Sequence, residues 1–209
     1  MTRIPLLPES EAVAKVEKTH GRIKEILGTE AVPDIFLASG RGPAFLQDFY
    51  MNFKRFVFND GKIGAKTKSV IGLAVAFNAN CEPWIEYFRD RGRQLGVTEQ
   101  QFAEIAAVSA TNTMYNAFFK FRGISGNDLF EGMPVGLRAH TFANASLDDV
   151  TVELIDIAIS DLNACKPCVS GHVAQARKLN ISEDAILETA QCAATMSAGI
   201  HFLRSAGCC

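Results

Sequence analysis

Two cysteines, a histidine and a glutamate lie at spacings that could support thiol chemistry. Cys165 and Cys168 are three residues apart, His172 follows four residues later, and Glu153 precedes Cys165 by twelve residues. A thiolate can attack a peroxide or a disulfide, and a second thiol can resolve the product as a disulfide. Imidazole and carboxylate groups can carry the protons of such a reaction. These four residues are therefore the candidate redox centre.

A helix would bring these side chains together. Because a helix turns by about 100° per residue, Cys165, Cys168 and His172 would share one face roughly 60° wide. Pro167 lacks a backbone N–H and is tolerated only in the first turn of a helix, so it places the helix start near Cys165. The positive end of the helix dipole, together with Lys166, should favour thiolate over thiol.

Other uses of these cysteines compete with a redox role. Cys165, Cys168, His172 and Glu153 could bind zinc, but a structural zinc site usually has a second ligand pair, and none follows at suitable spacing. The cysteines could instead be buried and unreactive, although polar partners gather on the same face. A permanent disulfide is disfavoured in a reducing compartment.

The composition is that of an ordinary globular protein. The chain has 209 residues, 48% of them hydrophobic and 21% charged, which suits one domain or two small ones. A net charge of −2 without long basic runs argues against a nucleic-acid partner. The N-terminus does not resemble a signal peptide, and no apolar run is long enough for a membrane span. We therefore expect a cytoplasmic protein in which the six cysteines are not paired structurally.

Helical periodicity dominates the chain, which predicts an all-α fold. Residues 9–27 read as a helix with Ser10 as its cap and Gly28 as its stop. Residues 43–57 carry aromatic side chains at helical spacing. Such a stripe could line a substrate channel, but core or subunit packing is the better interpretation.

The chain also contains an internal repeat. Residues 67–121 align without gaps on residues 151–205, at an offset of 84 positions. Each copy reads as three helices, preceded by an N-terminal helical extension (1–66) and separated by a linker (122–150). We treat the whole as one domain of 1–209. Identical pairs include Cys81/Cys165, Pro83/Pro167, Glu104/Glu188 and Phe118/Phe202.

The first copy keeps the helical pattern but lacks the reactive residues. Glu153, Cys168 and His172 correspond to Ser69, Trp84 and Phe88. If these positions served packing alone, one copy would hardly be polar where the other is aromatic. The second copy is therefore the expected active repeat, and the first a degenerate one.

At these spacings the four residues resemble the active site of the alkylhydroperoxidase D proteins, within the carboxymuconolactone decarboxylase-like superfamily. The resemblance extends through residues 114–123 and 136–138, and it covers roughly the last hundred residues well. It implies an all-α, duplicated fold and a homo-oligomer, a trimer or a hexamer. It also implies reduction of hydroperoxides by a dithiol that an external lipoamide-like or thioredoxin-like reductant recharges.

The resemblance assigns a role to each site residue. Cys168 would be the peroxidatic thiolate, Cys165 the resolving thiol and proton donor, and His172 with Glu153 the proton relay. Helix geometry agrees in part, because His172 lies one turn from Cys168 but two turns from Cys165. The helix dipole argues the other way, since Cys165 is nearer to the positive end. We expect Cys168 to react first.

One position departs from the family pattern. Members often carry a histidine between the two cysteines, where this chain has Pro167. We therefore expect weak peroxidase activity or a preference for another oxidant, whereas dithiol exchange needs only the two sulfurs.

The remaining cysteines and His201 have simpler interpretations. Cys208 and Cys209 end the sequence and should be mobile and exposed. Cys81 has no thiol partner at its own repeat site and is taken as structural, and Cys192 is taken as core packing. His201 is expected in the core or at a subunit interface.

The leading hypothesis is a thiol-dependent peroxidase that uses no cofactor and no metal. A decarboxylase or isomerase acting on lactone-like substrates is the first alternative, because the same superfamily includes such enzymes. A non-enzymatic oligomeric binding protein with vestigial cysteines is the second alternative.

Overall fold

The computed structural model describes residues 3–143 and 145–209, and within these ranges every regular element is helical. This confirms the all-α prediction. No helix in the described ranges combines the length and the hydropathy needed to cross a membrane. The main helices are α1 (Lys15–Leu27), α2 (Asp34–Leu37), α3 (Pro43–Asn52), α4 (Ala65–Ala79), α5 (Glu82–Gln94), α6 (Glu99–Ile124), α7 (His140–Ala143), α8 (Asp149–Leu162), α9 (Lys166–Lys178) and α10 (Glu183–Ala206).

Three consecutive helices recur at the offset of the sequence repeat. Helices α4, α5 and α6 begin at residues 65, 82 and 99, and α8, α9 and α10 begin at 149, 166 and 183. The third helices of both units also carry side-chain caps at equivalent positions. Thr98 and Gln101 form a reciprocal capping box at α6, whereas Ser182 caps α10 by accepting a hydrogen bond from the Ala185 N–H. Each three-helix unit therefore begins its helices at equivalent positions.

Helix α8 packs against four other helices, α4, α6, α9 and α10. All residues from Thr151 to Ser160 are buried, so this helix has no solvent-facing stripe along that stretch. Any polar side chain in that stretch is consequently placed inside the protein. Glu153 lies there.

Two equivalent glutamates fix the chain just before the first helix of each repeat. Glu188 of α10 accepts a hydrogen bond from the Ile63 N–H at 2.8 Å, ahead of α4. Glu104 of α6 accepts one from the Ser146 N–H at 2.8 Å, ahead of α8. Glu188 also pairs with the fully buried Lys68 at 3.2 Å. In each repeat, a glutamate of the third helix thus fixes the backbone just before the first helix.

The N-terminal extension departs from the sequence prediction at its first helix. Helix α1 begins at Lys15, and Glu9–Glu11 form a separate 3-10 turn, so Ser10 caps no long helix. Glu9 accepts hydrogen bonds from the Val32 N–H and from Lys24, which ties this turn to other segments. Tertiary contacts therefore override the local helical pattern here. Gly28 ends α1 in the left-handed region, as expected.

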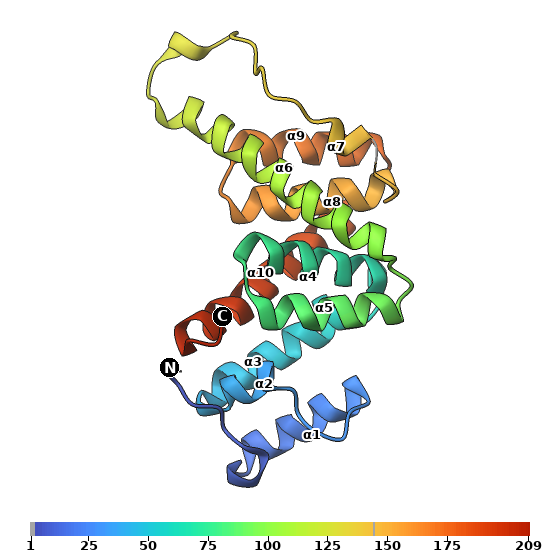
Figure 1. The fold of residues 1–209 in the computed structure, drawn as a ribbon, viewed down its shortest axis with the longest axis vertical. Helices are drawn as coiled ribbons and strands as arrows, with labels where there is room; N and C mark the ends of the chain where they lie inside the picture. Colours follow the sequence, from blue (N-terminus) through green and yellow to red (C-terminus); the bar gives the residue numbers. More distant parts are fainter. Residues whose placement is uncertain (1–2, 144) are drawn as a thin grey trace.

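The aromatic stripe of the extension packs into the core, which confirms that interpretation. Helix α3 continues into a π-helical turn at Phe53–Phe58, and Phe49 and Phe53 are buried. Together with Phe36 they surround Trp84 of α5 at ring-centroid distances of 5.9 Å. Figure 1 shows the extension at one end of an elongated molecule, α4 and α5 in the middle, and α8 and α9 beyond them.

The C-terminus is anchored, which corrects the prediction of a mobile cysteine tail. Cys209 forms a disulfide with Cys81, 128 residues earlier, and the Cys208 N–H donates to the carbonyl of Leu203. The N-terminal segment meets the same place, because the Arg3 N–H donates to the Ala206 carbonyl at 2.7 Å. Cys81 therefore has a thiol partner that its own repeat does not supply, and one cysteine pair does link distant segments.

Candidate active site

The two site cysteines lie at the start of α9, as the sequence predicts. Cys165 is the residue before the helix, Pro167 falls in its first turn, and Cys168 follows within that turn. The sulfurs of Cys165 and Cys168 form a disulfide. The helix start thus holds the dithiol in its oxidised form.

The two sulfurs differ in their access to solvent. Cys165 is 0% exposed, whereas Cys168 is 8% exposed. Cys168 also lines a cavity, and Cys165 does not contribute to that lining. A reactant that enters the cavity would therefore meet Cys168 first.

His172 and Glu153 form a hydrogen-bonded pair between α9 and α8. The His172 Nδ1 lies 2.8 Å from the Glu153 Oε1, and both side chains are largely buried. Burial by itself lowers the pKa of His172, but the hydrogen bond to Glu153 and the charges of Asp156 and Glu153 outweigh it and raise this pKa. The pair is thus arranged to hold a proton on the imidazole.

A second buried carboxylate, which sequence reasoning missed, lies beside this pair. Asp156 follows Glu153 by one turn of α8 and is 3% exposed. Burial, together with the nearby Glu153 charge, raises the pKa of Asp156 to about 7, against the opposing effects of His172 and a hydrogen bond from Asn112. The repeat held the missing signal, because Asp156 corresponds to Gly72 in the first copy.

Helix α6 contributes a buried amide network that fixes Asp156. The Asn112 side-chain N–H donates to the Asp156 carboxylate at 2.8 Å and to its backbone carbonyl at 2.9 Å. The Asn112 carbonyl accepts hydrogen bonds from Asn116 at 2.6 Å and from Ser160 at 3.1 Å. These partners orient the Asn112 amide so that its donors face Asp156.

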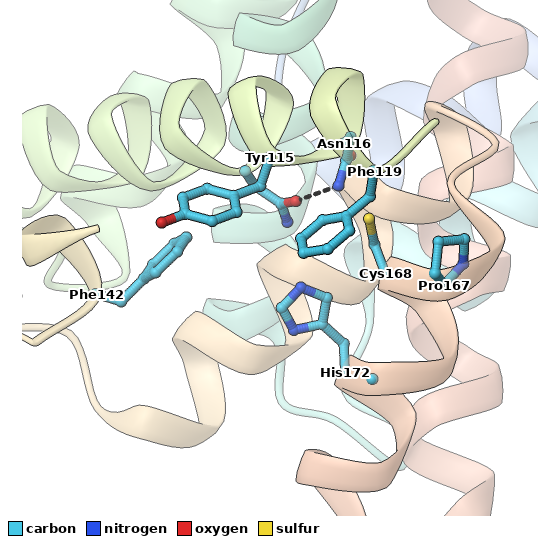
Figure 2. Close-up of a pocket in the computed structure, with 9 residues that line it drawn as sticks. Tyr115, Asn116, Phe119, Phe142, Pro167, Cys168 and His172 are labelled. Atoms are coloured by element: carbon cyan, nitrogen blue, oxygen red, sulfur yellow. Dashed lines mark hydrogen bonds between the residues drawn. The ribbon is translucent and has the colours of Figure 1, made fainter. Parts of the chain in front are cut away.

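A cavity of about 270 Å³ opens beside Cys168. Its lining combines Cys168 and His172 with aromatic and apolar side chains. Figure 2 shows the Cys168 sulfur and the His172 ring facing this space from α9, opposite side chains of α6 and with Phe142 of α7 at its edge. The lining residues are Asn112, Tyr115, Asn116, Phe119, Phe142, Pro167, Cys168, Gly171 and His172.

A second cavity, of about 500 Å³, lies on the carboxylate side of His172. Glu153, Asp156 and Gln175 line it, and Cys168 does not. His172 and Phe142 belong to the linings of both cavities. The imidazole therefore borders the space beside the sulfur as well as the space beside the carboxylates.

Three donor atoms on the carboxylate side lie close enough to share one cation. One ligand atom each from Glu153, Asp156 and His172 lies within 4.8 Å of the others. Oxygen-rich sets of this kind suit hard divalent ions better than zinc. The two cysteines do not belong to this group among the described residues, so it differs from the zinc site weighed above.

The other sequence candidates lie outside this site. His201 is exposed and borders a separate cavity with Asn78 and Arg204, so it does not lie in the core, and a place at a subunit interface stays a prediction. Cys192 is fully buried, and its sulfur contacts the Lys68 carbonyl at 3.8 Å, which confirms a packing role. Cys208 is a partly buried free thiol.

The degenerate copy fills the equivalent space with aromatic rings. Trp84 and Phe88 are 0% exposed and stack at a centroid distance of 5.8 Å, and Ser69 of α4 is also buried. Phe36, Phe49 and Phe53 of the extension pack against Trp84. Packed aromatic side chains consequently fill the first copy at the positions where the second copy has the disulfide and the adjoining cavity.

Curated relatives carry the name alkyl hydroperoxide reductase AhpD. The protein from Solibacter usitatus (strain Ellin6076) is 32% identical over 100 residues, which are 48% of this chain and 56% of that protein. The one from Acidobacterium capsulatum is 26% identical over 158 residues, 75% of this chain and 85% of that protein. The chain thus spans little more than half of the first relative and most of the second.

A family model matches both halves of the molecule. The model of the carboxymuconolactone decarboxylase family matches residues 45–122 and again residues 129–207. The first match covers α4, α5 and α6 up to residue 122, and the second covers α8, α9 and α10 with every residue of the disulfide, imidazole and carboxylate group described above. Since the matches cover well over half of the sequence, the chain belongs to the carboxymuconolactone decarboxylase family and is AhpD-like within it.

Proposed function

We propose that this protein is a thiol-dependent peroxidase that cycles between the Cys165–Cys168 disulfide and the free dithiol. One observation carries the proposal: the disulfide lies at a cavity whose lining also includes His172, hydrogen-bonded to Glu153. The AhpD name of the relatives supports a peroxide-related role. No cofactor is needed for this chemistry, because the sulfurs carry the two electrons.

Cys168 is the sulfur that meets the peroxide in this proposal. Its partial exposure at the cavity supports that role, and the complete burial of Cys165 suits a resolving thiol. Access thus outweighs the position of Cys165 nearer to the helix dipole. In the reductive step the same difference directs an external dithiol to Cys168, with Cys165 as the leaving thiol.

The cycle balances in three steps. The Cys168 thiolate attacks the terminal peroxide oxygen, the O–O bond breaks, and the alkoxide leaves with the proton that His172 took from the thiol. Cys165 then attacks the sulfenic acid, forming the S–S bond and releasing water. An external dithiol reduces this disulfide and is itself oxidised to a disulfide.

The cavity favours an organic hydroperoxide with a small apolar group. Tyr115, Phe119, Phe142 and Pro167 give it an apolar wall, and its volume of about 270 Å³ suits an alkyl or aryl substituent. Asn116 and His172 supply polar groups that can orient the peroxide oxygens. Hydrogen peroxide has no apolar substituent that could contact this wall.

We also propose that the protein works as a homo-oligomer, a trimer or a hexamer. The end of α6 and the loop after it expose large apolar side chains, and this region projects from the body of the molecule (Figure 1). Exposed apolar groups in one region often mark an interface. The main ones are Phe121, Ile124, Leu129 and Met133. The lipoamide-like or thioredoxin-like reductant and the cytoplasmic location stay predictions.

Consumption of cumene hydroperoxide with dihydrolipoamide as reductant tests the function. Cys168→Ser should abolish turnover, because serine cannot form the sulfenic acid. Cys165→Ser should allow one oxidation and then stop. Cys208→Ser, which removes a free thiol outside the site, is the control and should keep wild-type turnover. Undiminished turnover in Cys168→Ser would exclude the proposal.

The family match leaves one alternative activity, decarboxylation or isomerisation of a lactone-like substrate. Such a reaction needs acid and base groups but no sulfur pair. Alkylation of Cys165 and Cys168 after reduction separates the two, because it should abolish peroxide consumption and spare a lactone reaction.

A further inference from the structure

The carboxylate side of the site holds more negative charge than its surroundings neutralise. Glu153 and Asp156 are both buried, at 8% and 3% exposure, and their ligand atoms lie within 4.8 Å of each other and of His172. One imidazolium can balance one carboxylate. The second carboxylate needs a further positive charge, either a proton or a cation, because an unpaired buried charge is costly.

Charged and polar groups from the neighbouring helices surround Asp156. Glu153 faces it from α8, His172 faces it from α9, and the uncharged Asn112 donates to it from α6. Helices α4 and α10 also pack against α8, but their buried charged residues, Lys68 and Glu188, pair with each other. Among the described residues no lysine or arginine makes an ion pair with Asp156.

The first repeat shows that the scaffold packs without this carboxylate. Gly72 occupies the position of Asp156, and Phe88 occupies that of His172. A Cβ atom at Gly72 would lie 2.4 Å from the Phe88 ring, so no side chain fits there. Both Asp156 and His172 thus differ from their counterparts in the first repeat, as expected if the two residues function together.

His172 borders both cavities, and Asp156 lines the second of them. The cavity beside Cys168 does not reach Asp156, and the cavity beside Asp156 does not reach Cys168. A proton taken from the thiol can therefore pass through the imidazole to the carboxylate side without crossing the space where the peroxide binds.

We propose that Asp156 is a positioning residue that acts through His172. It holds, beside the second cavity, the proton that His172 accepts from Cys168, and returns that proton through His172 when the alkoxide leaves. The proposal rests on the proposed function for its thiol step. No net proton is lost, because the alkoxide leaving group takes up one proton for each one that Cys168 gives away. A near-neutral pKa of Asp156 agrees with this role.

The first test follows Asp156 without any peroxide. Infrared difference spectra of wild type against Asp156→Asn should show a protonated carboxyl band that titrates near neutral pH. Asp161→Asn, which removes an exposed acid from the same helix, is the control and should leave that band in place. Absence of a titrating band in wild type would overturn the proposal.

The second test measures the rate of Cys168 alkylation by iodoacetamide in the reduced protein as a function of pH. In wild type this rate should rise in a step near neutral pH. We expect Asp156→Asn to lose that step and Asp156→Glu to restore it. With cumene hydroperoxide the rate in Asp156→Asn should fall roughly 10-fold, less than the ~10²–10⁴-fold loss for a group that transfers the proton directly.

The outcomes separate the two proposals. If the pH step in alkylation depends on Asp156 but no peroxide is consumed, the proposed role of Asp156 holds and the proposed peroxidase function is wrong. If peroxide is consumed and Asp156→Asn keeps the wild-type pH profile, only the role of Asp156 fails. A stoichiometric divalent metal that is retained by wild type and lost in Asp156→Asn would also overturn the role, because the three donors would then serve a cation.

Discussion

At the scale of residues, access distinguishes the two cysteines of the site. Both belong to one helix start, yet Cys168 borders a cavity and Cys165 is sealed. The pair of Glu153 and His172 supplies a base with a raised pKa next to the accessible sulfur. The chemistry thus depends on which side chains line the cavity as much as on the spacing of the cysteines.

Replacing Glu153 with glutamine tests this pairing. Glutamine removes the charge that raises the pKa of His172, so the imidazole should lose its proton at lower pH. We expect the acidic limb of the pH profile of kcat/KM for cumene hydroperoxide to move to lower pH. The plateau should fall by about 10-fold to 100-fold, because a less basic imidazole is a weaker base.

Glu183→Gln, at the exposed start of α10, is the matched control and should keep both the limb and the plateau. An acidic limb that stays in place in Glu153→Gln would show that Glu153 does not set the pKa of His172.

The sequence predicts most of this site but not all of it. Cys165, Cys168 and His172 come together because a helix start and one face of α9 fix their directions. Glu153 meets His172 from the neighbouring helix α8. Asp156 escapes notice because its role depends on the depth of α8 in the core, which a helical period does not report. The walls of the cavity depend on how α6 and α7 cross α9, and this is a tertiary property.

At the scale of elements, one scaffold supports two different interiors. Helices α4 and α5 close over aromatic rings, and the equivalent helices α8 and α9 enclose polar groups and two cavities. Gly72 marks the difference, because the Phe88 ring occupies the space that a side chain would need. The aromatic rings of the extension complete the closed copy, which gives the first sixty residues a structural task.

Gly72→Ala should destabilise the protein. Its new methyl group would lie 2.4 Å from the Phe88 ring, inside a packed helix pair. Overpacking of this kind costs about 1–3 kcal/mol in the free energy of unfolding. Urea titration of wild type and variant measures this difference as a shift of the unfolding midpoint.

Gly21→Ala is the matched control, since this glycine lies inside α1 with nothing within 4 Å of its would-be Cβ. It should stabilise the protein by up to ~1 kcal/mol through a better helix propensity. Equal stability of Gly72→Ala and wild type would mean that Phe88 moves aside freely and that the closed copy is loosely packed.

At the scale of the whole molecule, a disulfide joins the start of α5 to the end of the chain. Cys81 and Cys209 are 128 residues apart, and the N-terminal segment bonds to the same region through Ala206. No local pattern could predict this pair, because it depends on the path of α10 back to the first repeat. The helix starts of the two repeats, by contrast, follow the offset of 84 residues that the sequence shows.

Cys209→Ser should lower stability only under non-reducing conditions. Closing a long loop restricts the unfolded chain, and loss of such a link typically costs about 2–5 kcal/mol. Thermal unfolding without reductant should therefore show a lower Tm for the variant, whereas both proteins should unfold alike in excess dithiothreitol. Peroxide turnover should stay at the wild-type level, and equal Tm values without reductant would show that the link contributes nothing.

Disulfide formation between Cys165 and Cys168 can be read from the mass of one tryptic peptide after a stoichiometric pulse of cumene hydroperoxide. Residues 139–177 contain both Cys165 and Cys168, and they stay in one peptide because trypsin does not cut the Lys166–Pro167 bond. Starting from reduced protein, we expect this peptide to lose two hydrogens and to retain no oxygen. An unchanged mass, or oxygen retained on a single cysteine with no disulfide, would contradict it.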